Sequence, residues 1–365
     1  MSLLDYISYV MIVFAVIAGL DRIFGNKLGL GEEFEKGIYM IAPLTISMAG
    51  MLVMAPIISV GLSSIAHIFP EAWDFSIVPA ALLANDMGAA HLALDLAKTE
   101  EIGYFNGLVV GAMMGCTVCF TIPYSMQVIK KEDQGYYMLG TLCGLITIPI
   151  GCIAAGIIAG INLKLLINNL IPLVIFAVIL AIGLAKFEKI AVKFLMALGW
   201  LMKAVITVGL VAGIIEFLLG VKILPYMDTF DDVMGIIVNI ICIMAGAFPL
   251  LNILKKILTK VMLKMGGKLG VNEVSSFGLL TTLGTPLTTF ETFDDMDKLG
   301  IVLNAAFIVS ACCVLMDHLA FTMVWNPAFL PAVIIGKLVA GVTAVALAYL
   351  VFGRTGKIKG AEPKE

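Results

Sequence analysis

An aspartate within an apolar stretch is the first residue of this chain whose type and position could do chemistry. Asp86 lies in the segment Pro79–His91, which has apolar sequence on both sides. An ionised side chain at the centre of a lipid bilayer costs about 2.5–3.5 kcal/mol on insertion scales, so such a residue has a partner or a function. A carboxylate at that depth suits a cationic ligand, a coupling ion, a proton or a buried lysine. The residue by itself leaves these four open.

A second polar group is a set of five threonines around Gly284 and Pro286. The five are Thr281, Thr282, Thr285, Thr288 and Thr289. Their hydroxyl groups could hydrogen-bond a small ligand. Alternatively they satisfy the backbone of their own interrupted helix, which is the simpler interpretation for any single threonine.

Three further ionisable residues lie in or beside apolar stretches nearer the C-terminus. Lys337 either pairs with Asp86 or Asp317, or extends its ammonium group to the membrane interface. Asp317 and His318 end an apolar stretch and either relay a proton or position a loop.

The chain has no pattern that is typical of an enzyme or a metal site. It contains no HExxH motif, no GxSxG or Ser–Lys arrangement, and no carboxylates with metal-ligand spacing. Cys116 and Cys119 form a CxxC pattern inside apolar sequence, where small packing residues are the simpler interpretation. We therefore expect neither catalysis nor a cofactor or metal. The net charge of −3 gives no sign of nucleic-acid binding.

The elements that must position these residues are membrane helices. Of the 365 residues, 61% are hydrophobic and 13% are charged, a composition that predicts an all-α bundle of helices in a lipid bilayer. No polar stretch is long enough to fold alone, so we expect one transmembrane domain over residues 1–365. The first apolar stretch, 4–20, has no basic region before it and is expected to be a retained helix.

Nine apolar stretches are long enough to cross a bilayer. They fall near 4–20, 38–65, 105–129, 136–160, 165–186, 195–220, 233–254, 300–320 and 328–352. Two others, 76–97 and 273–292, are rich in Gly, Pro, Ser, Thr and Ala, and they contain Asp86 and Pro286. Such broken segments occur where backbone leaves the helix to line a protein cavity.

The positions of lysine and arginine decide whether the two broken segments cross the membrane. If all eleven stretches crossed, the five lysines between 255 and 268 would lie opposite the basic C-terminus. If 76–97 and 273–292 are re-entrant, every basic cluster lies on one face, as the positive-inside rule requires. We therefore predict nine spans and two re-entrant segments, with the N-terminus outside and the tail 354–365 in the cytoplasm.

A weak internal repeat agrees with this topology. Met48–Gly50 recurs as Met244–Gly246, 196 residues later, and Leu83, Gly88 and Gly140 have matches at the same offset, namely Leu279, Gly284 and Gly336. The matches predict repeat 1 over about 1–160, a linker helix over about 161–186 and repeat 2 over about 187–353. Because five crossings separate equivalent points, the two repeats are expected to be inverted, which is typical of secondary transporters.

Five short strings in the chain are more specific than hydropathy, namely LLANDMG at 82–88, GAMMG at 111–115, TIPIGCI at 147–153, DHLAF at 317–321 and GKLVAGVTA at 336–344. These strings resemble the EutH family of ethanolamine-utilisation transporters. The resemblance runs in order over nearly the whole chain. It implies uptake of ethanolamine through the plasma (inner) membrane of a bacterium.

Ethanolamine is an ammonium cation with one hydroxyl group, so its site needs an anion or a π face and a hydrogen-bonding partner. The resemblance thus points to Asp86 as counter-ion and to Asn85 for the hydroxyl, with Gly88, Thr282 and Thr285 beside them. We further expect a homodimer and a coupling ion, either H⁺ or Na⁺. Two alternatives are the ion-translocating subunit of a decarboxylase-type pump and a carrier of another small amine.

Overall fold

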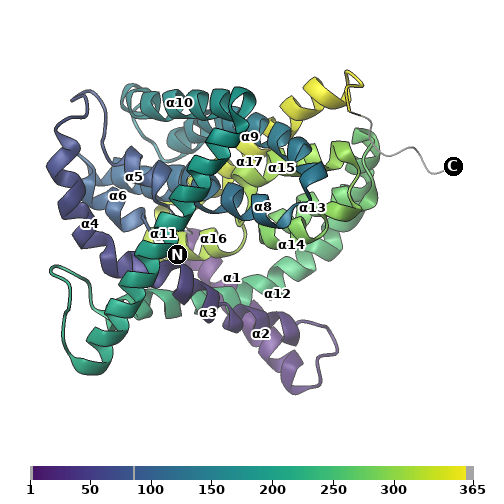
Figure 1. Ribbon diagram of the computed structural model, residues 1–365. Helices are drawn as coiled ribbons and strands as arrows, with labels where there is room; N and C mark the ends of the chain where they lie inside the picture. Colours follow the sequence, from purple (N-terminus) through teal and green to yellow (C-terminus); the bar gives the residue numbers. More distant parts are fainter. Residues whose placement is uncertain (1–2, 85–86, 359–365) are drawn as a thin grey trace. The chain divides into compact units, whose positions relative to one another are not determined.

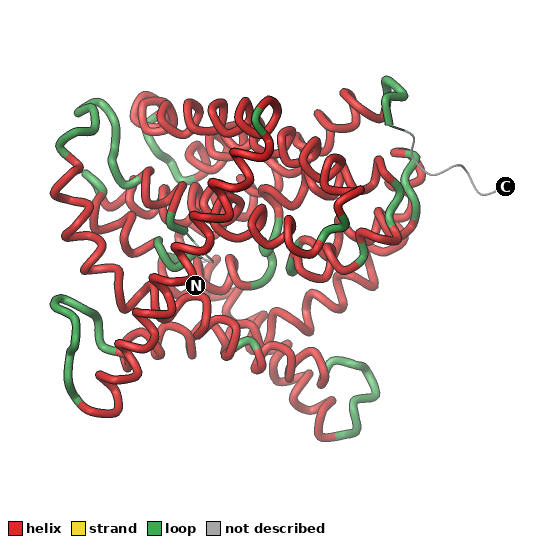
Figure 2. The backbone as a smooth tube through the Cα atoms, in the orientation of Figure 1, coloured by secondary structure: helices red, strands yellow, loops and turns green. Residues whose placement is uncertain are grey.

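The computed structural model describes residues 3–84 and 87–358, and within them the chain is helical without any β-strand (Figures 1 and 2). Eight helices in this part are long and apolar enough to span a membrane: Tyr6–Ile23, Gly31–Ala66, Glu100–Val128, Lys131–Ile158, Leu163–Lys186, Glu188–Leu219, Phe230–Thr259 and Pro327–Gly353. The prediction of an all-α multi-pass membrane protein is therefore confirmed.

These spans comprise one or several labelled helices each. The first four contain α1 (Leu3–Ile23); α2 (Gly31–Tyr39), α3 (Ile41–Leu44) and α4 (Gly50–Ala66); α7 (Glu100–Phe105) and α8 (Ile122–Val128); and α9 (Lys131–Ile158). The last four overlap α10 (Leu163–Lys186), α11 (Glu188–Leu219), α12 (Phe230–Leu269) and α17 (Leu330–Ala348), and α12 continues ten residues beyond its span. Between α7 and α8 the backbone takes π-helical turns over Asn106–Gly115 and Thr117–Thr121.

The structure differs from the predicted span at 300–320. A helix of 14 residues, α15 (Lys298–Ala311), ends there, and α16 (Asp317–Trp325) begins after a turn. Cys313 in that turn has a φ of 61°, a left-handed conformation in which an α-helix cannot continue. Its backbone N–H donates to the carbonyl oxygen of Thr282 instead of to its own helix.

Both stretches predicted to be broken are interrupted helices. Broken segment 1 consists of α5 (Ile77–Leu82), a turn and α6 (Ala90–Leu96). Broken segment 2 consists of α13 (Glu273–Thr282), a turn and α14 (Pro286–Glu291). The longest of these four helices has 10 residues and is about 15 Å long, half the thickness of a bilayer's hydrocarbon core.

The chain divides into two compact units, each made of three stretches. Unit 1 comprises Met1–Ala112, Trp200–Leu254 and Leu315–Leu330, and unit 2 comprises Met113–Gly199, Lys255–Val314 and Pro331–Glu365. Broken segment 1 belongs to unit 1, and broken segment 2 belongs to unit 2.

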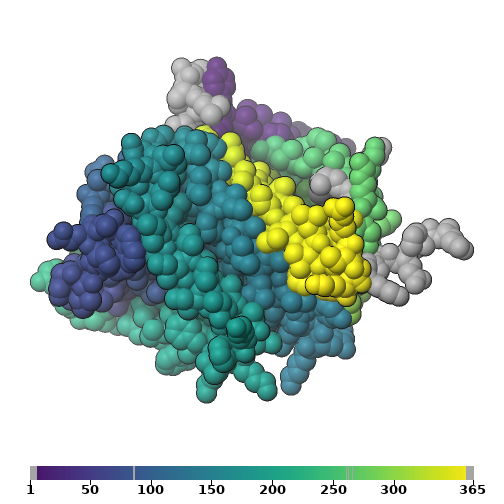
Figure 3. Space-filling view, turned by 90° about the horizontal axis from the view of Figure 1, so that it is seen from above, coloured from purple at the N-terminus to yellow at the C-terminus, as the bar shows by residue number. Residues whose placement is uncertain are grey.

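Small residues allow close helix packing inside both units, as is usual for membrane helices. In unit 1, a Cβ atom on Gly50 of α4 would lie 1.7 Å from the carbonyl oxygen of Ile206 on α11. In unit 2, a Cβ atom on Gly151 of α9 would lie 2.4 Å from the carbonyl oxygen of Gly336 on α17. Figure 3 shows the C-terminal helix (yellow) lying along the blue α9.

Candidate functional site

The expected counter-ion, Asp86, falls in the sequence between α5 and α6 of broken segment 1. Asn85 and Asp86 fall outside the described residues, but the chain on both sides is described. Helix α5 ends at Leu82, and Met87 resumes the chain with a φ of 66°. A non-glycine residue in this left-handed region costs about 1–3 kcal/mol, and such strain is concentrated at functional sites.

The residues that flank this interruption are buried against α4. Ala84, Ala89 and Leu92 form an apolar cluster that packs on Ile58 and Leu62 of α4. Met87 is 1% exposed and Gly88 is buried as well. The described backbone on both sides of residues 85–86 is therefore held by apolar packing.

An aromatic cluster lies beside α6 in unit 1. The ring of His91 is 4.7 Å from that of Trp325, which in turn lies 5.2 Å from Tyr104 and 5.5 Å from Phe321. Tyr104 also approaches Phe329. Such π systems attract ammonium groups when a ring face is accessible. The cluster was not predicted; its only signal in the sequence is the spacing of Phe321 and Trp325, which places them on one side of a helix.

The threonines of broken segment 2 bond mainly to one another and to their own backbone. The Thr289 hydroxyl is 2.9 Å from that of Thr281 and 3.0 Å from that of Thr282. Both Thr281 and Thr289 also lie within hydrogen-bond distance of the Gly278 carbonyl oxygen. Thr285 is the N-cap of α14, where its side chain accepts from the N–H of Leu287 at 3.3 Å.

This network has a definite hydrogen-bonding capacity. If Thr281 and Thr282 donate to Thr289 and Thr289 donates to Gly278, all three hydroxyl protons are used within the segment. The oxygens of Thr281 and Thr282 then retain free lone pairs, since each hydroxyl can accept as well as donate. Thr282 is buried, whereas Thr281 is half-buried. The segment can accept hydrogen bonds from a ligand more easily than it can donate them.

The remaining candidates fall in different units. Asp317 is the first residue of α16 in unit 1, and His318 beside it is completely buried. Lys337 lies on α17 in unit 2 and is 0% exposed. The alternative in which Lys337 extends to the membrane interface is therefore wrong, because its ammonium group is enclosed by protein. Its proposed pairing with Asp86 lies outside the described residues.

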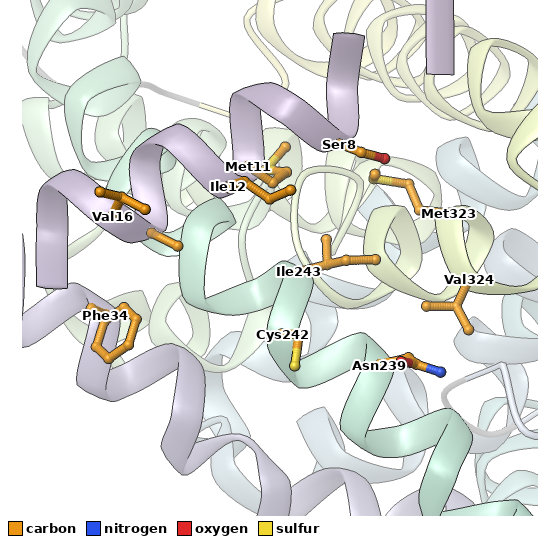
Figure 4. A pocket seen from close by; sticks show the side chains of 11 residues that line it. Ser8, Met11, Ile12, Val16, Phe34, Asn239, Cys242, Ile243, Met323 and Val324 are labelled. Carbon is orange, nitrogen blue, oxygen red and sulfur yellow. The ribbon is translucent and has the colours of Figure 1, made fainter. Parts of the chain in front are cut away.

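Unit 1 also has an open groove of about 660 Å³ between α1, α2, α12 and α16 (Figure 4). Its lining is mostly apolar, with Met11, Ile243 and Met323 among the side chains shown, and its polar members are Ser8, Asn239 and Cys242. None of the lining residues carries a charge. The groove therefore offers an ammonium ligand no charged counter-ion.

Comparison with known proteins identifies the family. The model of the family described as "Ethanolamine utilisation protein, EutH" matches residues 3–351. The chain belongs to the EutH family. No solved structure matches this EutH chain significantly.

Three curated relatives carry the same printed name, "Probable ethanolamine permease EutH". The one from Listeria monocytogenes is 40% identical over 349 residues, which cover 95% of this chain and 94% of the relative. Those from Salmonella typhimurium and Escherichia coli are 33% and 32% identical, and each alignment covers 96% of both proteins. The predicted membership of the EutH family is thus confirmed along almost the entire sequence.

Proposed function

We propose that this multi-pass protein of the bacterial inner membrane carries ethanolamine into the cell without chemical conversion. The observation that carries the proposal is the interruption of an apolar helical segment between α5, which ends at Leu82, and α6, which begins at Ala90, in a chain whose relatives are named ethanolamine permeases. A carboxylate at such an interruption complements a small organic cation at membrane depth.

In this proposal Asp86 binds the ammonium group and Asn85 hydrogen-bonds the hydroxyl group of ethanolamine. Gly88 leaves room for the ligand because it has no side chain. Thr282 and Thr285 contribute from broken segment 2. The free lone pairs of the threonine network support an acceptor role toward the ammonium N–H groups, whereas the bond from Leu287 N–H to the Thr285 hydroxyl supports a capping role for Thr285.

The transport cycle follows from the proposed inverted repeat, in which broken segments 1 and 2 are equivalent elements around one substrate site. Alternating access then requires one set of helices to move against another. We propose a homodimer whose static helices are drawn from α1, α10 and α11. Of the eight candidate spans, those of α1 and α11 have the smallest share of buried residues. Asp317, His318 and Lys337 are candidates for charge compensation or proton relay, and the coupling ion is H⁺ or Na⁺.

Uptake by purified protein tests the proposal. Proteoliposomes are given labelled ethanolamine with no gradient, with a proton gradient and with a sodium gradient, beside protein-free liposomes. Saturable uptake that unlabelled ethanolamine inhibits supports the function, and stimulation by one gradient identifies the coupling ion. Uptake no faster than in protein-free liposomes under all three conditions contradicts it, and sodium movement that ignores ethanolamine favours an ion-translocating subunit.

A further inference from the structure

Each broken segment starts at a group of buried or half-buried residues joined by hydrogen bonds, here called its base cluster. Base cluster 1 consists of Asp74, Ser76 and Asn106, and base cluster 2 consists of Asn272, Ser275, Asp297 and Asn304. We propose that Asn106 and Asn304 are positioning residues, each of which holds the broken segment of its own unit, on which the candidate ligand residues lie. This inference rests on the proposed function.

Base cluster 1 joins the two ends of broken segment 1 to the helix that follows it. One carboxylate oxygen of Asp74 accepts from the N–H and the hydroxyl of Ser76 at 3.0 and 2.6 Å, and the other accepts from the N–H of Lys98 at 2.9 Å. Asn106 then donates its amide N–H to the Ser76 hydroxyl at 2.8 Å. All three side chains of the cluster are buried.

Base cluster 2 also joins the two ends of its broken segment to the helix that follows, but its carboxylate comes after the segment and not before it. Asp297, the N-cap of α15, accepts from the N–H of Asn272 at 2.9 Å and from the hydroxyl of Ser275 at 2.8 Å. Asn304 donates its amide N–H groups to the carbonyl oxygens of Ser275 and Gly300, at 2.8 and 2.9 Å. Both donors of this completely buried amide are thus committed.

The two asparagines occupy equivalent positions. Asn106 lies six residues after Glu100, the first residue of α7, and Asn304 lies six residues after Lys298, the first residue of α15. Their partners precede them by 30 and 29 residues and lie at the start of the broken segment in both cases. Two different sets of hydrogen bonds therefore connect equivalent points of the two broken segments. This indicates that the connection itself is required, whichever atoms make it.

The strained turn explains why such a connection matters. Met87 keeps its left-handed conformation only if the surrounding structure holds the chain on both sides. Residues 77–84 are held at one end by base cluster 1, and the next residues in the sequence are Asn85 and Asp86. Loss of the bond between Asn106 and Ser76 frees the start of this short arm and so displaces the turn at its other end.

Base cluster 1 and base cluster 2 differ in a way that provides a matched control. The Asn106 bond ends on a side chain, the hydroxyl of Ser76, whereas the Asn304 bond ends on the main-chain oxygen of Ser275. Ser76→Ala and Asn106→Ala both remove the bond between these two side chains, and Ser76→Ala also removes the bond to Asp74, so their effects should be less than additive. Ser275→Ala and Asn304→Ala remove different bonds, so their effects should be closer to additive.

The test measures KM for ethanolamine uptake and the melting temperature of purified protein for all four single variants and both double variants. We expect Asn106→Ala and Ser76→Ala each to raise KM about fivefold, and the double variant to raise KM by less than the product of the two single increases. Thr322→Val is the control for loss of a buried hydroxyl, because Thr322 donates only within α16, at 2.7 Å to His318. It should lower the melting temperature without raising KM.

The outcomes separate this inference from the proposed function. If wild-type protein takes up no ethanolamine, the proposed function fails, while the non-additive melting temperatures still test the connection between Asn106 and Ser76. Melting temperatures that change with KM unchanged in Asn106→Ala and Ser76→Ala would show a purely structural role and overturn the inference. If Asn106→Ala does not fold, an unchanged KM in Ser76→Ala overturns it equally.

Discussion

Alanine in place of Gly50 should destabilise unit 1, and the contact distances set the size of the effect. The added Cβ atom would lie 1.7 Å from the carbonyl oxygen of Ile206, half the 3.4 Å at which ordinary contact begins. Gly209 of α11 meets α4 in the same way, since a Cβ atom there would lie 2.1 Å from the Gly50 carbonyl oxygen. Both obstructing atoms belong to backbone, so the helices themselves must separate. Overpacking of this kind costs about 1–3 kcal/mol or more.

Gly61 on the same helix is the matched control. A Cβ atom at this position meets nothing within 4 Å, so Gly61→Ala should be neutral or gain up to about 1 kcal/mol from helix propensity. Thermal unfolding of both variants in detergent compares them directly, with a lower melting temperature expected for Gly50→Ala alone. A Gly50→Ala protein that melts at or above the temperature of Gly61→Ala would refute the close crossing of α4 and α11.

Three further predictions concern other parts of the chain. Thr289→Val should weaken ethanolamine binding more than Thr288→Val, because Thr289 joins two other hydroxyls whereas Thr288 is exposed and bonds only its own turn; equal effects in a binding titration would contradict the network. Of the seven cysteines only Cys242 is exposed, so a small thiol reagent should add one label per native chain, detected by mass spectrometry, and none to Cys242→Ser. The Lys130–Asp294 ion pair raises the pKa of Lys130. Its contribution to the free energy of unfolding should therefore be constant below the ordinary lysine pKa of 10.5 and be lost as the pH rises through the raised value. A difference in melting temperature between wild type and Lys130→Met that disappears near neutral pH would contradict this prediction.

Composition and local pattern were sufficient to predict both interruptions and eight of the nine expected spanning helices, all but the one at 300–320. Apolar stretches of spanning length have few alternatives in a chain with this composition. Broken segments 1 and 2 were predictable because Gly, Pro and clustered Thr weaken a helix within an apolar sequence. The same polar and helix-weakening residues also predict that each interruption is a polar stretch among apolar helices.

The break between α15 and α16 was not predictable in this way. Residues 312–316 read Cys-Cys-Val-Leu-Met, with neither glycine nor proline, and an apolar run of this kind predicts a continuous helix. The left-handed conformation of Cys313 and its bond to Thr282 come from tertiary contacts within unit 2. A local pattern contains no information on such contacts.

The role of Asn106 and Asn304 also escaped the sequence. Matching residues at a fixed offset of 196 aligns α5 with α13, which begin at 77 and 273, but α7 and α15 begin at 100 and 298, two residues further apart. The two asparagines therefore fall out of register in a fixed-offset comparison and look like ordinary helix-packing residues. Their equivalence becomes visible only when each is counted from the start of its own helix.

The account depends most directly on Asp86 as the partner of the ammonium group. Calorimetric titration of ethanolamine into purified wild-type, Asp86→Asn and Asp95→Asn proteins tests it, with Asp95 as a second carboxylate on broken segment 1. A charge-assisted contact is worth about 1.5–3 kcal/mol, so Asp86→Asn should bind at least about tenfold more weakly while remaining folded, and Asp95→Asn should bind normally. If Asp86 instead pairs with Lys337, Asp86→Asn should lose stability and Lys337→Met should restore it. A stable Asp86→Asn protein with wild-type affinity for ethanolamine would contradict the account.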